Sequence, residues 1–285
     1  MRAIRLHAPG GIHGLALDDV SVPVPGDGEV LVRVHAAAIT RDELDWPTDR
    51  LPAIPSYEVS GVVEAVGSGA GLAVGDEVFG LTPFDRDGVA AEFVVVPTAV
   101  LGRKPRSLGH IESAALPMPA LTAWQGLFDH GKLEAGQRVL IHGATGGVGH
   151  VAMQLARWKG AQVTGTASGA SGDGILDRSA APFEEAIEPV DLVFDTVGGD
   201  TLRRSPSVLA DGGRLVSVAE EPPEGAGIYF VVEPSGAQLA EIARLADSGV
   251  LEVEIDSVFE LAEVRAAFER LAQPGKHGKV VLRVS

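Results

Sequence analysis

The chain has 285 residues, 45% of them apolar, which is enough for one large domain or two ordinary ones with a full core. Its net charge is −16 and it has no run of lysine and arginine, which argues against nucleic acids and anionic membrane surfaces as partners. It has no cysteine, which excludes disulfides, thiolate chemistry and cysteine-ligated zinc or iron–sulfur centres.

Nothing in the sequence predicts a signal peptide or a membrane span. The first residues, Met1 to His7, have the pattern of a strand and lack the apolar core of a signal peptide. No apolar run approaches the roughly 20 residues that a bilayer requires. We therefore expect a cytoplasmic protein.

Residues 1–105 are predicted to be mostly β. Turns rich in glycine, proline and aspartate separate four apolar runs. These runs are 30–36, 59–66, 77–80 and 90–97. Short strands at this spacing favour a small barrel or sandwich. The segment 40–57 is charged and interrupted by proline, so we expect a loop there with one helical turn.

Helical periodicity replaces the β pattern from Ile111 onward. Three later strands are predicted at 163–166, 190–194 and 214–218. Three later helices are predicted at 199–210, 236–248 (with Ser235 as N-cap) and 261–272. The final strand, 279–284, resembles those of the first hundred residues, and we infer that it returns to that region.

The stretch from Val139 to Thr166 predicts a strand, a tight glycine turn, a helix and a second strand. The turn has the spacing Ala144-x-Gly146-x-x-Gly149. Gly146 would let the backbone approach a pyrophosphate, and Gly149 would let the helix pack closely on the strand. The amino end of the helix then offers free N–H groups to the phosphates. This pattern predicts a dinucleotide site.

The segment after the second of these strands conflicts with a regular doubly wound sheet. It is short and glycine-rich, 169–174, and Ile175 and Leu176 follow it. A parallel crossover normally needs a dozen or more residues, usually helical. Either the helix is missing or 175–176 is not a parallel strand, and we predict a trimmed nucleotide-binding half.

Five motifs in this order resemble those of a known superfamily. They are Ala115-Leu-Pro117, Leu121-Thr-Ala-Trp124, the run His142 to Gly149, the run Phe194 to Gly199, and Gly278-Lys-Val-Val-Leu282. The chain resembles the medium-chain dehydrogenase/reductase superfamily, in its zinc-free branch of zeta-crystallin-like quinone oxidoreductases.

The resemblance implies an α/β protein in two domains with a cleft between them. A GroES-like catalytic domain would span 1–117 and be completed by 252–285. A trimmed Rossmann NADP-binding domain with a doubly wound parallel sheet would span 118–251. NADPH as hydride donor and a homodimer are implied as well.

The resemblance also carries site residues onto this chain. Thr122 would lie near the nicotinamide, Thr166 to Ser168 at the adenosine ribose, and Asp195 to Gly198 beside the cofactor. The implied cofactor-binding residues are Thr122, Ala144, Thr145, Gly146, Gly147, Val148, Gly149, Thr166, Ser168, Asp195, Val197, Val218, Phe230 and Lys279. Core packing for Val218 and Phe230, and salt bridges for Asp195 and Lys279, are the plainer alternatives.

Zinc-dependent relatives take three metal ligands from the catalytic domain. The matching positions here are Thr40, Tyr57 and Met118, which are poor zinc ligands. The cysteine-rich structural-zinc lobe is absent too. We predict no catalytic and no structural metal.

The cofactor choice depends on the end of the second strand. An acidic residue about 20 positions past the glycines would bind the ribose 2′-hydroxyl and select NAD. Thr166-Ala-Ser168 stands there instead. Arg178 could reach a 2′-phosphate, whereas Asp173 and Asp177 oppose it. We predict NADPH.

Without a metal, the acceptor must be polarised by a hydrogen-bond donor. Reduction of a quinone or an enone leaves the charge on a conjugated oxygen, for which a donor is sufficient. Tyr57 is the first candidate and Thr40 the second; the alternative is that Tyr57 only packs under the loop 40–57.

Three functions remain open. The first is reduction of a small-molecule quinone or enone by direct hydride transfer. The second is enoyl reduction of a thioester or polyketide intermediate, and the third is cofactor binding without significant turnover.

Overall fold

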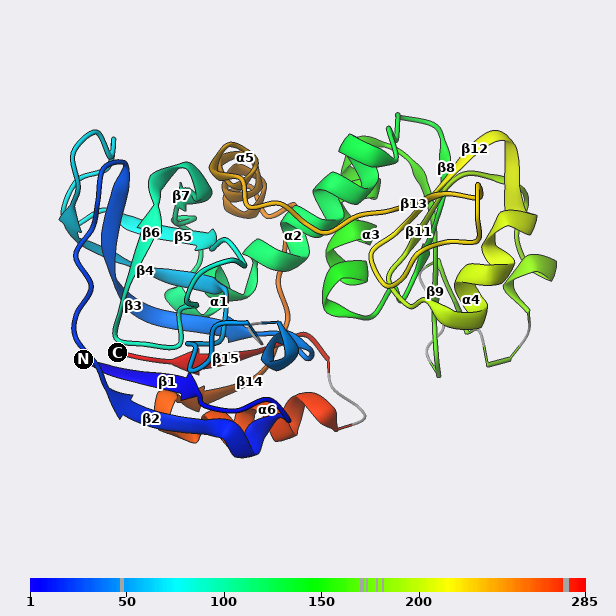
Figure 1. Cartoon of the computed structure of the whole chain (residues 1–285). Helices are drawn as coiled ribbons and strands as arrows, with labels where there is room; N and C mark the ends of the chain where they lie inside the picture. Colours follow the sequence, from blue (N-terminus) through cyan, green and yellow to red (C-terminus); the bar gives the residue numbers. More distant parts are fainter. Residues whose placement is uncertain (47–48, 170–171, 173, 178, 181, 274–276) are drawn as a thin grey trace. The chain divides into compact units, whose positions relative to one another are not determined.

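The computed structural model describes residues 1–46, 49–169, 172, 174–177, 179–180, 182–273 and 277–285 (Figure 1). The chain divides into two compact units. Unit 1 comprises Met1–Met118, Pro234–Gly249 and Val253–Ser285, and unit 2 comprises Pro119–Glu233 and Val250–Glu252. No helix in the described ranges is both long and apolar enough to cross a membrane.

Unit 1 is built on a seven-stranded sheet in the order β14-β15-β3-β4-β5-β7, with β6 paired to β3. Its strands are β3 (Glu29–Ile39), β4 (Glu58–Val66), β5 (Glu77–Leu81), β6 (Phe93–Pro97), β7 (Leu101–Arg103), β14 (Ile255–Glu260) and β15 (Lys279–Arg283). A separate antiparallel pair is formed by β1 (Arg2–Leu6) and β2 (Leu15–Asp19). The helical elements are α1 (His110–Ala115), α5 (Gly236–Asp247), α6 (Val264–Ala272) and the short turns η1 (Ile12–Gly14), η2 (Glu43–Asp45), η3 (Thr98–Val100) and η7 (Leu261–Glu263).

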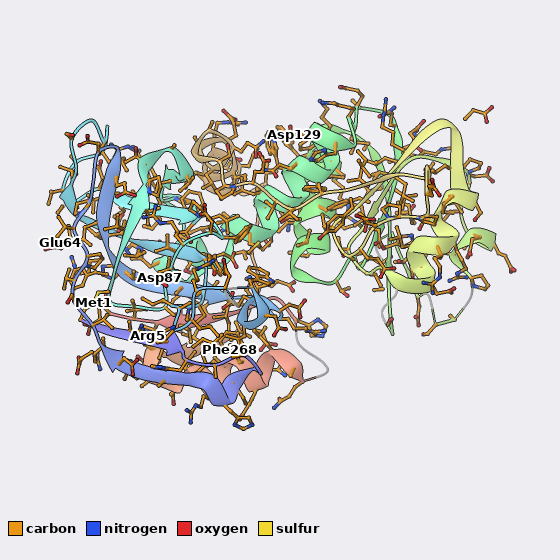
Figure 2. All side chains as sticks on the ribbon, viewed as in Figure 1. Met1, Arg5, Glu64, Asp87, Asp129 and Phe268 are labelled. Carbon is orange, nitrogen blue, oxygen red and sulfur yellow. The ribbon has the colours of Figure 1, made fainter. Side chains whose placement is uncertain are left out.

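The long strand β3 organises unit 1. It pairs with β4 along one edge, and along the other edge with β6 in its first half and β15 in its second half. The return of the final strand to the first region, predicted from sequence, is therefore confirmed. The core includes Val30, Val32 and Val34 of β3, and α6 adds Phe268 (Figure 2).

Unit 2 contains a six-stranded parallel sheet in the order β10-β9-β8-β11-β12-β13. Its strands are β8 (Arg138–His142), β9 (Gln162–Ala167), β10 (Ile175–Asp177), β11 (Val190–Asp195), β12 (Leu209–Ser217) and β13 (Ile228–Tyr229). Its helical elements are η4 (Gln125–His130), α3 (Gly147–Lys159), η5 (Phe183–Glu185), α4 (Gly199–Arg204) and η6 (Ser205–Val208); α2 (Pro117–Trp124) begins in unit 1 and continues into unit 2. The Rossmann-type sheet predicted from sequence is confirmed.

At the trimmed edge of this sheet, the alternative that 175–176 is not a parallel strand is wrong. β10 is parallel to β9, and among the described residues between them none is helical. A short connection is sufficient because Ile175 lies beside Gly165, near the end of β9, so the chain turns back over only a few residues.

Helix α5 belongs to unit 1, whereas the expected domain boundary placed it with the nucleotide-binding half. Its N-cap is Ser235 as predicted, with the hydroxyl accepting a hydrogen bond from the Gln238 N–H at 3.3 Å. The helix nevertheless packs on β7, where a Cβ on Gly102 would lie 3.0 Å from the Leu239 Cβ. Burial of this apolar face assigns the helix to unit 1.

Candidate functional site

The glycine turn joins β8 to α3 in unit 2. The N–H groups of Gly143 and Ala144 bond to the Thr166 carbonyl at 3.0 and 2.9 Å, which fixes the turn to β9. A Cβ on Gly149 would lie 2.1 Å from the Gly143 oxygen, so only glycine fits there. The predicted role of Gly149 in close helix–strand packing therefore has a direct geometric basis.

The residues of this turn fit a dinucleotide pyrophosphate. Gly146 is exposed and Thr145, Gly147 and Val148 are partly exposed. The N–H groups of the first helical turn have no carbonyl partner within the helix, and the helix dipole adds positive potential there. A reduced nicotinamide cofactor would supply a hydride when bound, and the turn would only hold and orient its phosphates.

Thr166 does not present its hydroxyl to solvent at the end of β9. The residue is fully buried, and its hydroxyl lies 2.8 Å from Nδ1 of His142, whose Nε2 lies 3.0 Å from the Ser205 hydroxyl. This network joins β9, β8 and the segment after α4. Ser168 is exposed just beyond the strand, so of these two predicted ribose contacts only Ser168 has an accessible side chain.

Asp195 fixes the turn that follows β11. Its buried carboxylate accepts hydrogen bonds from the Gly198 N–H at 2.9 Å, the Val197 N–H at 3.3 Å and the Ser217 hydroxyl at 3.0 Å. Burial raises its pKa above the usual range. This geometry fits a structural role for Asp195. The role is exerted through hydrogen bonds and not through the salt bridge that was the plainer alternative.

The remaining unit 2 predictions lie on or beside its core. Thr122 is buried on α2. Phe230 is buried and packs on His130 with ring centroids 4.4 Å apart. Val218 is half-buried and donates its N–H to the Asp195 carbonyl at 3.1 Å. The surroundings of Phe230 therefore fit the plainer alternative, that this residue packs in the core.

A charged cluster in unit 1 brings Lys279 together with Thr40. The Lys279 ammonium donates to a buried Glu58 carboxylate oxygen and, at 3.2 Å, to the Thr40 hydroxyl. The other Glu58 oxygen accepts the Met118 N–H at 3.0 Å. Burial raises the pKa of Glu58, and Lys279 and its hydrogen bond oppose that rise.

Glu43 is a second buried carboxylate, and it lies in the charged segment 40–57 that was predicted to be a loop with one helical turn. Its two oxygens accept the N–H groups of Thr40 at 2.9 Å and Ser56 at 3.1 Å. Burial raises its pKa to about 8, so the group carries a proton at neutral pH. No periodic signal marks it, because it lies in a three-residue turn.

Tyr57 is fully buried among aromatic rings. Its centroid lies 5.6 Å from that of Trp46 and 5.3 Å from that of Phe84. Its hydroxyl accepts a hydrogen bond from Arg50 at 3.0 Å and keeps its own proton for donation. Burial raises its pKa, with Arg50 acting in the opposite direction.

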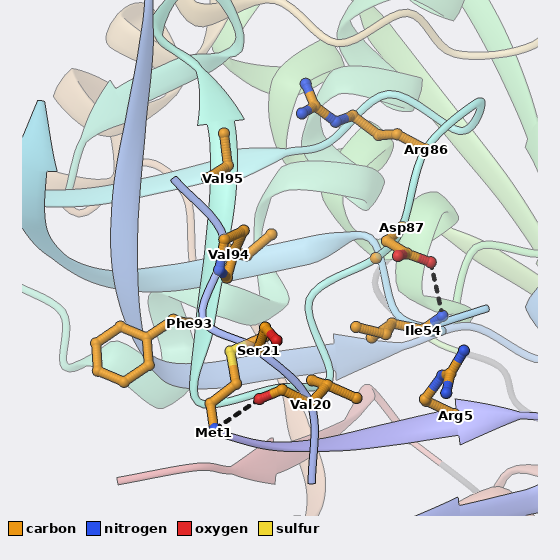
Figure 3. Close-up of a pocket in the computed structure, with 12 residues that line it drawn as sticks. Met1, Arg5, Val20, Ser21, Ile54, Arg86, Asp87, Phe93, Val94 and Val95 are labelled. Atoms are coloured by element: carbon orange, nitrogen blue, oxygen red, sulfur yellow. Dashed lines mark hydrogen bonds between the residues drawn. The ribbon is translucent and has the colours of Figure 1, made fainter. Parts of the chain in front are cut away.

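A cavity of about 490 Å³ lies elsewhere in unit 1 (Figure 3). Several of its polar groups already have partners. The Met1 ammonium donates to the Val20 carbonyl, the Ile54 N–H donates to Asp87, and Arg86 pairs with Glu29 at 3.0 Å. It therefore offers little to a charged ligand.

Comparison with known proteins decides the family. Residues 26–106 match the alcohol dehydrogenase GroES-like domain, and residues 172–282 match a zinc-binding dehydrogenase domain. A probable zinc-binding oxidoreductase of Arthroderma benhamiae is 32% identical over 95% of this chain and 93% of its own. A 2-methylene-furan-3-one reductase of Solanum lycopersicum is 32% identical over 96% and 76%. The quinone oxidoreductase structure from Coxiella burnetii superposes with a TM-score of 0.90 at 29% identity, covering 100% and 99%.

The chain belongs to the medium-chain dehydrogenase/reductase superfamily, quinone oxidoreductase type. This medium-chain reductase is therefore an oxidoreductase that uses a nicotinamide cofactor, NAD(P)H, on a small-molecule substrate.

The donor set of this medium-chain reductase does not fit zinc, despite the name of the matching domain. Thr40, Tyr57 and Met118 are poor ligands, and Glu58 is already neutralised by Lys279. Within the described ranges, no group of three or more histidine, aspartate or glutamate side chains is arranged to hold a metal.

Proposed function

We propose that this protein is an NADPH-dependent reductase of quinones or α,β-unsaturated carbonyls that works by direct hydride transfer without a metal. The observation that carries the proposal is the environment of Thr40, a partly exposed residue whose hydroxyl accepts a hydrogen bond from a buried lysine. Reduction leaves negative charge on a conjugated acceptor oxygen, and a fixed hydrogen-bond donor stabilises it. The similarity to a furanone reductase and a quinone oxidoreductase favours these acceptor classes.

Thr40 is the better placed of the two candidate donors. Tyr57 has no exposed surface, so it reaches an acceptor only if Trp46 or Phe84 moves aside. We propose that Thr40 contacts the acceptor oxygen and that Tyr57 shapes the wall beside it. Solvent completes the protonation of the product.

NADPH is the proposed cofactor, held at Ala144 to Gly149 with Ser168 toward the ribose. No acidic residue stands at 166–168 to bind a 2′-hydroxyl. Arg178 and Asp173, which we had considered for the 2′-phosphate, lie outside the described residues. Asp177 is described, and its carboxylate accepts the Gly169 N–H at 3.0 Å.

Titration of tryptophan fluorescence with NADPH and NADH tests this choice. We expect a lower Kd for NADPH, and Asp177→Asn should lower it further by removing a negative charge near the phosphate. Tighter binding of NADH would contradict the choice.

A panel of acceptors tests the reaction. We expect NADPH oxidation with 1,4-naphthoquinone and with a simple enone. Turnover confined to enoyl thioesters would favour the enoyl reductase alternative, and NADPH binding without turnover on any acceptor would favour a binding protein.

We also propose a cytoplasmic homodimer. The strand β13 is the edge of the unit 2 sheet, and Ile228, Tyr229 and the adjacent Val231 are 44%, 42% and 59% exposed. Exposed apolar side chains on a sheet edge favour pairing with another chain. Sedimentation equilibrium of the wild type and of Ile228→Lys tests this; a monomeric wild type would contradict it.

A further inference from the structure

Lys279 is buried and contacts both the carboxylate of Glu58 and the hydroxyl of Thr40, the candidate hydrogen-bond donor to the acceptor. It begins β15, Glu58 begins β4, and Thr40 directly follows β3, so three adjacent strands bring these groups together. Lys279 is 9% exposed and Glu58 is fully buried. The ammonium bonds to Glu58 and to the Thr40 hydroxyl.

Lys279 lies against two buried carboxyl groups. Glu58 of β4 accepts its hydrogen bond, and Glu43 of η2 is buried nearby and bonds to the Thr40 N–H at 2.9 Å. If Lys279 lost its proton, Glu58 would be a buried carboxylate without a counter-charge, which is strongly unfavourable. The pairing of Lys279 with Glu58 therefore favours solvent as the source of the proton that the product takes up.

From this geometry we propose that Lys279 is the fixed cation of the acceptor site, acting through the Thr40 hydroxyl. It would stabilise the negative charge that reduction leaves on the acceptor oxygen, at the region where zinc-dependent relatives use a metal. Lys279 is thus a positioning residue rather than a proton donor. This inference rests on the proposed function and adds a role for a residue otherwise assigned to cofactor binding.

The Thr40 hydroxyl can serve this purpose without any change in the charge of Lys279. Its oxygen accepts a bond from the ammonium, which polarises the O–H and makes it a stronger donor. The hydroxyl proton, which also interacts with Glu58, turns toward the acceptor oxygen as charge develops there. Water then protonates the product, so no proton has to leave Lys279.

Steady-state kinetics and NADPH Kd values for four variants test the proposal. Lys279→Met should lower kcat with 1,4-naphthoquinone by about 100-fold, as loss of one charge-stabilising group does. Lys279→Arg should restore kcat to within about 10-fold of the wild type, because the charge is kept. Thr40→Val should resemble Lys279→Met, and the double variant should be no slower than the slower single one, because both act as one unit. The NADPH Kd should change less than about 3-fold in all four.

Two further variants keep the test decisive. Lys159→Met removes a lysine from the partly exposed ion pair with Glu134, 3.3 Å away, and should leave kcat unchanged. If Lys279→Met does not fold, Lys279→Met with Glu58→Gln removes both charges together and should show the same loss of kcat. A raised NADPH Kd with unchanged kcat, or additive effects of Thr40→Val and Lys279→Met, would overturn the proposal. A wild type that binds NADPH but reduces no acceptor would instead contradict the proposed function.

Discussion

Arg50 donates a hydrogen bond to the Tyr57 hydroxyl at 3.0 Å, and the same guanidinium nitrogen also donates to the carbonyls of Phe84 and Arg86. The tyrosine is therefore held from the loop side and covered by Trp46 and Phe84. This arrangement makes Tyr57 part of a packed wall in which its hydroxyl has a protein partner.

Tyr57→Phe is expected to affect stability more than turnover. Loss of the hydroxyl removes one hydrogen bond to a charged group, worth roughly 1.5–3 kcal/mol. We expect this loss in urea unfolding, with kcat changed less than about 3-fold, and Thr40→Val should lower kcat much more. A fall in kcat of about 100-fold for Tyr57→Phe at unchanged stability would make Tyr57 the donor instead.

Glu43 predicts a component of stability that declines as the pH rises. Its pKa is about 8 in the folded protein, against an ordinary value of 4.5. The folded state therefore binds the proton more tightly, so this contribution is fully present below 4.5 and is lost as the pH rises toward 8.

Glu43→Gln should remove this pH dependence, although its amide loses one of the two backbone hydrogen bonds. The measurement is the free energy of unfolding in urea at several pH values between 4.5 and 8.5. Glu64→Gln, at an exposed position on β4, is the matched control and should keep the wild-type slope (Figure 2). An unchanged slope in Glu43→Gln would show that Glu43 is ionised when folded.

His110 predicts the opposite behaviour in acid. It stacks on His35 with ring centroids 4.3 Å apart, and burial together with the neighbouring histidine lowers its pKa to about 4 from 6.5. The unfolded chain binds the proton first, so stability falls as the pH drops from 6.5 toward 4. His110→Gln should reduce this loss in acid unfolding curves. The exposed His13, replaced in the same way, should not.

Two glycines of the phosphate turn should separate stability from cofactor binding. Gly149→Ala places a methyl 2.1 Å from a backbone oxygen, so we expect a loss of about 1–3 kcal/mol in stability as well as weaker NADPH binding. Gly146→Ala meets only the Gly143 oxygen at 3.2 Å and should mainly raise the NADPH Kd. Equal NADPH affinity in Gly146→Ala and the wild type would argue against the proposed phosphate position.

The sequence was sufficient where a local pattern determines the structure. The Ser235 cap, the glycine turn before α3 and the return of β15 to β3 all follow from residue type, spacing and strand character. The parallel pairing of β10 was not predictable, because it depends on the register of Ile175 with Gly165 rather than on loop length. The packing of α5 on β7 was not predictable either, because the sequence does not show whether the apolar face of this helix packs on unit 1 or on unit 2.

The candidate site was only partly predictable for the same reason. Thr40 and Lys279 were each identified, but their hydrogen bond joins residues 239 positions apart. Glu43 lies in a turn and Glu58 in a strand, and their burial arises only when β3, β4 and β15 come together. Thr166 was identified by position, yet its hydroxyl is directed to His142.

The central claim is reduction of a conjugated acceptor by NADPH without a metal. The most direct measurement is the rate of NADPH oxidation with 1,4-naphthoquinone, before and after dialysis against a strong chelator, with the zinc content of the same samples. We predict an unchanged rate at far less than one zinc per chain. A rate that is lost with the metal and restored by added zinc would contradict the account.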